Sequence, residues 1–216
     1  MCKTVIFDLD GTLLETVYDV MDSLNAMLSH YGYKLIDEKT ARAIICTGAV
    51  DLIKNAINQP VSMERVYECI DFFNNHYDNA NSPKSFLFEG ISELLIKLKK
   101  NGYKIAVLTN KPHVSTVKVY EKFLKEFDFD MYLGCGQNQN CKPHKSCATP
   151  IFDKLGVKPE DCYMVGDGDT DVLTAINCGM NCIAVLWGYR SKEQLANVGA
   201  KVFVNTPKEL EEIFGV

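Results

Sequence analysis

The 216-residue sequence lacks any hydrophobic run that approaches the roughly 20 residues a helix needs to cross a bilayer. It also lacks a cluster of Lys or Arg, and its formal net charge is -5 with a pI near 5.4. A nucleic-acid partner would require a basic face, so we expect neither membrane nor nucleic-acid binding. Met1 to Thr4 lead directly into a strand-like segment, and we expect no signal peptide before them and a cytoplasmic protein.

The nine cysteines are scattered, and their number is odd. With no export signal, free thiols in a reducing cytoplasm are the favoured interpretation. A zinc site at Cys135, Cys141 and Cys147 is the alternative. Five residues separate each neighbouring pair, which does not match the short C-x₂₋₄-C spacing of structural zinc sites.

The hydrophobic pattern predicts two kinds of segment. Apolar residues recur at helical spacing from 16 to 31, and 37 to 79 contain three amphipathic stretches with no convincing strand. Elsewhere helical stretches alternate with short apolar runs, which we interpret as strands at 5–7, 105–108, 131–133, 162–165, 182–186 and 201–204. This alternation predicts an α/β fold with a Rossmann-like parallel sheet, helices on both faces, and an inserted all-helical domain.

Chemistry-bearing residues follow several of the predicted strands. Asp8–Thr12 follow the first strand, Thr109–Lys111 follow the second, Lys142 begins a later helical stretch, and residues 166–171 read Gly-Asp-Gly-Asp-Thr-Asp. Within the first motif, Gly11 would let the chain turn sharply. Ligands of such sheets bind outside the carboxyl ends of the strands, so we expect these residues to meet at one edge.

Each motif alone is more typical of an ordinary turn than of a site. The combination is different, because carboxylates, a hydroxyl and an ammonium group reach the same edge of one sheet. Clustered acids repel one another unless a cation holds them. Oxygen ligands without a His or Cys cage indicate a hard ion such as Mg²⁺.

The order Asp-x-Asp-Gly-Thr, then Thr, then Lys, then Gly-Asp-x-x-x-Asp resembles the haloacid dehalogenase-type hydrolase superfamily over essentially the whole chain. The stretches 108–112 (Leu-Thr-Asn-Lys-Pro), 142–144 (Lys-Pro-His) and 187–190 (Trp-Gly-Tyr-Arg) are similar to its phosphoglycolate phosphatase-like branch. The resemblance implies a catalytic core formed by residues 1–15 and 83–216. It also implies a small helical cap domain, residues 16–82, that opens and closes over the site.

The resemblance also implies a mechanism. Asp8 would attack phosphorus and form an aspartyl phosphate, and Asp10 would act as general acid and then as general base. Mg²⁺ would be held by the Asp8 carboxylate, the Asp10 backbone carbonyl and Asp167. Thr109 and Lys142 would bind the transferring phosphoryl oxygens. The expected activity is Mg²⁺-dependent hydrolysis of a small, phosphoglycolate-like phosphate monoester.

Further residues have supporting roles in this interpretation. Asn110 is predicted to bind substrate, and Asp171 to orient Lys142 or a metal-bound water. Lys111, His144 and Arg190 lie near the rim by sequence position, where each could contact substrate. For His144 and Arg190 we favour solvated surface positions.

Several alternatives use the same motifs. A phosphomutase would pass the phosphoryl group to a second sugar hydroxyl, and a pyrophosphatase is a third possibility. Carbon–halogen hydrolysis does not need the second acid, Asp10, and is disfavoured. A non-catalytic binding protein is disfavoured because all the catalytic positions are filled. The expected partner is a small phosphorylated metabolite, and the chain is expected to be a monomer or homodimer.

Overall fold

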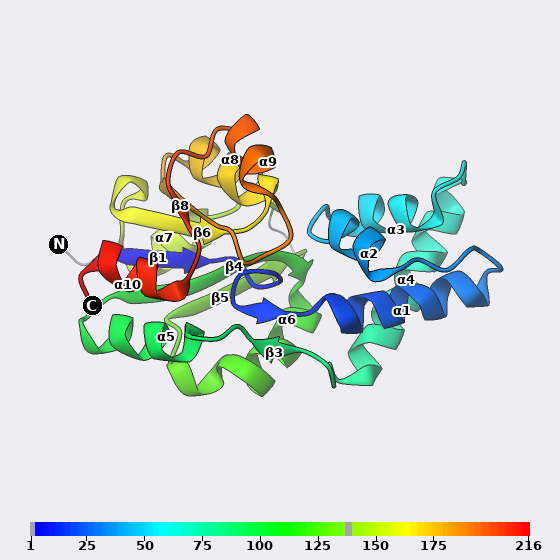
Figure 1. Cartoon of the computed structure of the whole chain (residues 1–216), viewed down its shortest axis with the longest axis horizontal. Helices are drawn as coiled ribbons and strands as arrows, with labels where there is room; N and C mark the ends of the chain where they lie inside the picture. Colours follow the sequence, from blue (N-terminus) through cyan, green and yellow to red (C-terminus); the bar gives the residue numbers. More distant parts are fainter. Residues whose placement is uncertain (1–2, 137–139) are drawn as a thin grey trace. The chain divides into compact units, whose positions relative to one another are not determined.

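The computed structural model describes residues 3–136 and 140–216. The chain divides into two compact units, one formed by Met1–Glu15 with Leu87–Val216 and the other by Thr16–Phe86. Figure 1 shows the first as a sheet with helices and the second as helices. Two short strands, β2 (Leu14–Glu15) and β3 (Phe86–Leu87), pair where the chain passes from one unit to the other.

The first unit is built on a six-stranded parallel sheet with the order β5-β4-β1-β6-β7-β8. The central strand, β1, pairs with β4 on one side and β6 on the other. The bounds of the strands are β1 Thr4–Phe7, β4 Lys104–Pro112, β5 Met131–Cys135, β6 Cys162–Gly166, β7 Asn181–Val185 and β8 Phe203–Val204.

Both faces of the sheet are buried. Successive side chains of a strand point to opposite sides, so one strand contributes residues to the cores on both faces. Val5 and Phe7 of β1 lie in one hydrophobic cluster, and Ile6 lies in the other. In the view of Figure 1, α5 lies on one side of the sheet and α8 on the other. The helices of this unit are α5 Ile91–Lys100, α6 His113–Val119, α7 Thr149–Leu155, α8 Asp169–Cys178, α9 Lys192–Asn197 and α10 Pro207–Phe214, with a π-helical turn at Tyr120–Leu124 and 3₁₀ turns at Lys125–Phe127 and Pro159–Asp161.

The second unit contains α1 (Val17–His30), α2 (Glu38–Ile44), α3 (Ala49–Ile57) and α4 (Met63–Ala80). Their buried residues recur at helical spacing, as Val20, Leu24, Met27 and Leu28 do on α1. These faces pack together, so each helix hides its apolar stripe against the others. No described part of residues 16–82 contributes a strand to the six-stranded sheet.

The compact helical unit ends at Phe86, whereas the sequence predicted a boundary at residue 82. The local cause lies at Asp19 of α1, which is buried and accepts hydrogen bonds from the Lys84 N–H and the Ser85 hydroxyl. These bonds hold the returning segment to the helices.

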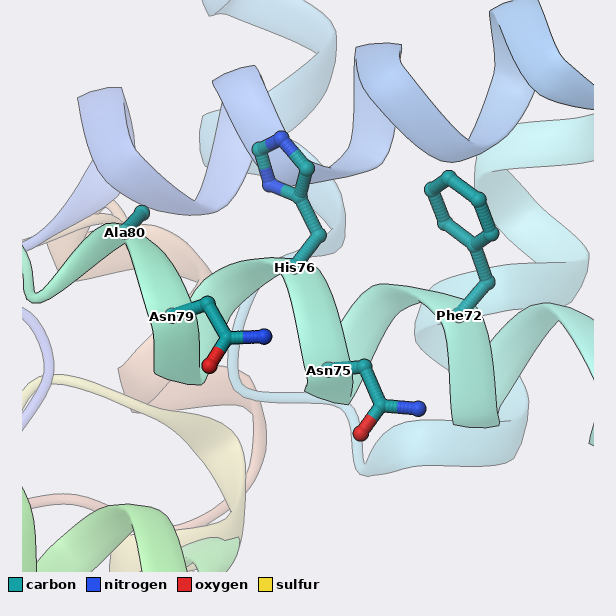
Figure 2. Close-up of a pocket in the computed structure, with 5 residues that line it drawn as sticks. All are labelled: Phe72, Asn75, His76, Asn79 and Ala80. Carbon is teal, nitrogen blue, oxygen red and sulfur yellow. The ribbon is translucent and has the colours of Figure 1, made fainter.

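A shallow hollow of about 440 Å³ lies on α4, lined by Phe72, Asn75, His76, Asn79 and Ala80. Phe72 and His76 project towards α1, where His76 bonds Ser23 through its ring nitrogen, and Asn75 and Asn79 project from another side of the helix (Figure 2). No carboxylate and no Lys or Arg side chain lines this hollow.

The cysteine prediction needs a correction. Cys135 and Cys141 are joined by a disulfide, with their Cα atoms 5.0 Å apart, so they are neither free thiols nor available as zinc ligands. Their spacing in the sequence could not reveal this proximity. The remaining described cysteines form no disulfide, in agreement with the predicted thiols: Cys46, Cys69, Cys147, Cys162, Cys178 and Cys182. Cys2 lies outside the described residues.

The predicted strands all have counterparts in the sheet, and the α/β Rossmann-like fold class is confirmed. One strand is longer than expected, because β4 continues through Thr109 to Pro112 with a register shift after Leu108. Among the described residues, no helix is both long and apolar enough to cross a membrane.

Candidate active site

The first motif is held against the carboxyl end of the sheet. The Asp8 N–H donates to the Val165 carbonyl at 2.9 Å, which keeps Asp8 in line with β6. The chain then turns, and the Gly11 N–H bonds the Leu14 carbonyl at 2.8 Å. Gly11 has φ +89°, and a Cβ there would lie 2.4 Å from a carboxylate oxygen of Asp167. This position therefore requires glycine twice, for its backbone conformation and for the space that Asp167 occupies.

The last motif brings two more acids to the same place. Asp167 directly follows β6 and is fully buried, and its oxygens accept hydrogen bonds from the Thr12 hydroxyl at 2.9 Å and the Tyr189 N–H at 2.8 Å. Asp171 lies in the first turn of α8 and accepts from the Gly168 N–H at 2.9 Å. Local hydrogen bonds therefore fix the orientation of both carboxylates before any ligand binds.

Lys142 lies between two of these acids. Its ammonium nitrogen is 2.8 Å from Asp8 Oδ1 and 2.6 Å from Asp171 Oδ1, and the three side chains are almost fully buried. Burial alone would lower the pKa of Lys142, but the charges and hydrogen bonds of Asp171 and Asp8 raise it above its ordinary value. Lys142 therefore stays charged at any ordinary pH.

Asp8, Asp167 and Asp171 each offer an oxygen atom within 4.8 Å of the others, and all three are buried. Burial first, and then the charge of Asp171, raises the pKa of Asp8 to about 7 although Lys142 opposes the shift. Burial, and then the charges of Asp8 and Asp171, raises the pKa of Asp167 to about 8. Three carboxylates and one ammonium group leave an excess of negative charge that a hard divalent cation would offset, so the donor set fits Mg²⁺.

The second motif holds the Lys142 segment in place. Thr109 is buried near the end of β4. The Asn110 side chain makes two hydrogen bonds to the main chain of Lys142: it donates to the carbonyl at 3.0 Å and accepts from the N–H at 2.8 Å. The Lys111 ammonium group lies 3.2 Å from Asp10 Oδ2, with its side chain only 7% exposed.

The structure thus collects the predicted residues into two neighbouring groups, one around Asp8 and Lys142 and one around Asp10 and Lys111. His144 is exposed, as expected, and its ring bonds Ser146. Arg190 is only 9% exposed, so the interpretation of it as a solvated surface residue is wrong. It follows Tyr189, whose backbone is tied to Asp167, and this connection draws the segment inward.

Sequence reasoning gave no role to several residues that shape the acid cluster. Thr12 and Tyr189 bond Asp167 directly, and the Trp187 ring N–H bonds the Thr12 carbonyl at 3.0 Å. A Cβ at Gly188 would meet Asp167 at 2.3 Å. The stretch 187–190 had stood out only as a family pattern, and this geometry supplies its physical reason.

A sequence model described as "Haloacid dehalogenase-like hydrolase" matches residues 5–185. The chain belongs to this family. It is 29% identical to the phosphoglycolate phosphatase of Xanthomonas campestris pv. campestris, over 97% of this chain and 95% of that one. It is also 29% identical to that of Vibrio cholerae, over 90% of this chain and 89% of that one.

A solved structure from Clostridium acetobutylicum, a predicted phosphatase, superimposes with a TM-score of 0.89 at 26% identity and covers the whole of both chains. The predicted superfamily and its phosphoglycolate phosphatase-like branch are confirmed. The chain is a phosphoric monoester hydrolase of this family, as its motifs predicted.

Proposed function

We propose that the chain hydrolyses a small phosphate monoester of the phosphoglycolate type, through an aspartyl phosphate on Asp8 and with Mg²⁺. The observation that carries this is the buried Asp8 carboxylate, 2.8 Å from the Lys142 ammonium group and within 4.8 Å of two further carboxylates. The phosphoglycolate phosphatases of Xanthomonas campestris pv. campestris and Vibrio cholerae support the substrate class.

In the first step, a carboxylate oxygen of Asp8 attacks phosphorus, and the bond from phosphorus to the ester oxygen breaks. Asp10 gives its proton to that leaving oxygen, so the product departs as a neutral hydroxyl group. Lys142 and the Thr109 hydroxyl hold the phosphoryl oxygens, and the ammonium charge offsets the negative charge that gathers there. Lys142 already contacts Asp8, so little rearrangement is needed for attack.

In the second step, Asp10, now a carboxylate, takes a proton from water while the water oxygen attacks phosphorus. The bond between phosphorus and Asp8 breaks, and inorganic phosphate and free Asp8 result. Each cycle therefore consumes one ester and one water and returns both acids to their starting states.

Asp8, Asp167 and the Asp10 backbone carbonyl would hold the Mg²⁺ ion. When bound, the ion supplies Lewis-acid stabilisation of the phosphoryl charge and reduces repulsion between that charge and the carboxylates. Thr12 and the Tyr189 N–H fix the orientation of Asp167 for this purpose.

Asp171 and Asn110 act through Lys142 in this proposal. Asp171 holds the ammonium end of the side chain at 2.6 Å, and Asn110 holds its main chain.

We further propose that residues 16–82 form a cap domain on the catalytic core of residues 1–15 and 83–216. Its four helices and its two covalent connections to the sheet unit support this role.

Phosphate release from phosphoglycolate and from p-nitrophenyl phosphate, with and without Mg²⁺, tests the proposal. Acid quenching of the Asp10→Asn variant during turnover, followed by mass spectrometry, should locate a phosphoryl group on the peptide containing Asp8. A phosphoryl group on another residue, or rapid phosphate release in excess EDTA, would refute the mechanism. Transfer to a sugar phosphate instead of water would identify a mutase.

A further inference from the structure

Lys111 stands out among the charged groups near the site because the proposed mechanism does not use it. Its ammonium group lies 3.2 Å from Asp10 Oδ2, and the two side chains are 7% and 10% exposed. The backbone holds it there, since the Lys111 N–H bonds the Thr109 hydroxyl at 3.2 Å and the Lys111 carbonyl accepts from Thr116 at 3.3 Å. The Lys111 side chain is therefore buried, and its ammonium group lies beside Asp10, the proposed general acid.

We propose that Lys111 determines specificity by binding a carboxylate carried on the leaving group, one carbon from the ester oxygen. This inference rests on the proposed function, in which Asp10 protonates that oxygen. It adds that Lys111 is the residue that selects such a 2-phosphoryloxy carboxylate over a neutral phosphate ester.

The geometry sets the reach of this contact. To protonate the leaving oxygen, Asp10 must lie about 3 Å from it. The Lys111 ammonium group lies 3.2 Å from Asp10 Oδ2, so when Oδ2 is the oxygen that donates the proton, the ammonium group stays within about 6 Å of the leaving oxygen. A carboxylate attached one carbon from that oxygen falls inside this reach. A neutral group there would gain no charge-assisted hydrogen bond.

In this proposal the two lysines bind different parts of the substrate. Lys142 is held between Asp8 and Asp171, on the side of the transferring phosphoryl group. Lys111 sits beside Asp10, on the side of the leaving group. A substrate with an anion at each end would meet one ammonium group at each end, whereas a neutral leaving group would bring no second anion to Lys111.

A matched pair of substrates tests this directly. Phosphoglycolate and 2-hydroxyethyl phosphate have nearly the same shape, but only the first carries a carboxylate. We expect the wild type to prefer phosphoglycolate in kcat/KM. In Lys111→Met the ratio of the two kcat/KM values should fall by roughly 10- to 100-fold, mainly through KM for phosphoglycolate.

Two further variants serve as controls. Lys111→Arg keeps the charge and should retain most of the preference. Lys158→Met removes an ammonium group from a side chain that is 77% exposed, and it should leave kcat/KM for both esters unchanged. Should Lys111→Met fail to fold, Lys111→Gln also removes the charge but keeps a polar end, and it carries the same comparison.

Equal losses on both esters in the folded variant, with the ratio within about threefold of wild type, would overturn the assignment and leave Lys111 as a positioning residue for Asp10. A wild type with no preference for phosphoglycolate would also overturn it. Failure of the proposed function looks different, because the wild type would then release phosphate from neither ester.

Discussion

The two units of the chain differ in the side chains that they bury. At the carboxyl edge of the sheet, charged side chains are buried and their partners lie far away in sequence, as with Thr12 and Asp167. In the helical unit, the buried side chains of α3 are apolar, and the buried acid Asp19 has a structural use, since it accepts hydrogen bonds from the Lys84 N–H and the Ser85 hydroxyl of the returning segment. Burying charge is unfavourable without partners, so a fold retains it where the charge has a use. The cluster of buried acids, and with it the proposed site of the chemistry, lies in the sheet unit.

Removing the nucleophile should have the largest effect. In Asp8→Asn an amide replaces the attacking carboxylate, and kcat should fall by more than ~10³-fold. Asp153→Asn, an exposed position on α7, makes the same chemical change away from the site and should keep wild-type turnover. Initial rates of phosphate release measure both. An Asp8→Asn enzyme within tenfold of wild type would contradict the assignment.

Metal removal should come next. The buried carboxylates outnumber the one ammonium group among them, so Mg²⁺ should bind. At 100 times its Kd it should stabilise the wild type by about 2.7 kcal/mol and so raise its melting temperature. EDTA should abolish phosphate release. Differential scanning calorimetry of Asp167→Asn serves as the comparison, and it should show a much smaller shift. An equal shift in both proteins would place the metal elsewhere.

Gly11→Ala tests the crowding around Asp167 with a matched control in the helical unit. Both Gly11 (φ +89°) and Gly32 (φ +74°) strain any other residue, but a Cβ at Gly32 meets nothing within 4 Å. We expect Gly32→Ala to lose about 1 kcal/mol of stability and no activity, since only backbone strain is added. Gly11→Ala should also lose at least ~10-fold in kcat/KM, because Asp167 must move. Similar kinetics for the two variants would show that Asp167 tolerates displacement.

The sequence predicted the elements well because their signals are local. The apolar run Val5–Phe7 and the helical spacing on α1 reflect burial patterns that each segment carries by itself. The strand-end rule then brought the motif residues to one edge of the sheet. Their assigned roles stay predictions, but the proximity of Asp8, Asp167 and Lys142 followed from topology alone.

What the sequence could not reveal depends on contacts between distant segments. The Tyr189 N–H bond to Asp167 is a backbone contact that no residue type encodes, and the burial of Arg190 follows the same segment inward. The Cys135–Cys141 disulfide likewise depends on how two chain positions approach each other. Lys111 could be placed near the rim, but its ion pair with Asp10 joins residues about a hundred positions apart, which the sequence does not show.

Asn110→Ala should have a moderate effect. It removes the clamp on the Lys142 main chain while leaving the ammonium contacts with Asp8 and Asp171 available. We expect roughly a tenfold loss of kcat, because looser positioning weakens rather than removes the phosphoryl contact. Asn101→Ala, whose amide bonds an exposed carbonyl at the end of α5, provides the control. A loss confined to KM would instead favour direct substrate binding by Asn110.

The smallest effect on turnover should come from the core of the helical unit. Ile53 of α3 is fully buried, and Ile53→Ala should destabilise the protein by about 2–4 kcal/mol through lost burial and an incompletely filled cavity. Leu35→Ala, at a side chain 55% exposed in the same unit, should change stability by less than about 0.5 kcal/mol. Chemical denaturation measures both. With p-nitrophenyl phosphate at a temperature where the variant is folded, kcat for Ile53→Ala should stay within about threefold of wild type, since no helix of this unit supplies a proposed catalytic group. A loss as large as that of Gly11→Ala would mean that the packing of the helices controls the chemical step, and the division of labour between the two units would have to be abandoned.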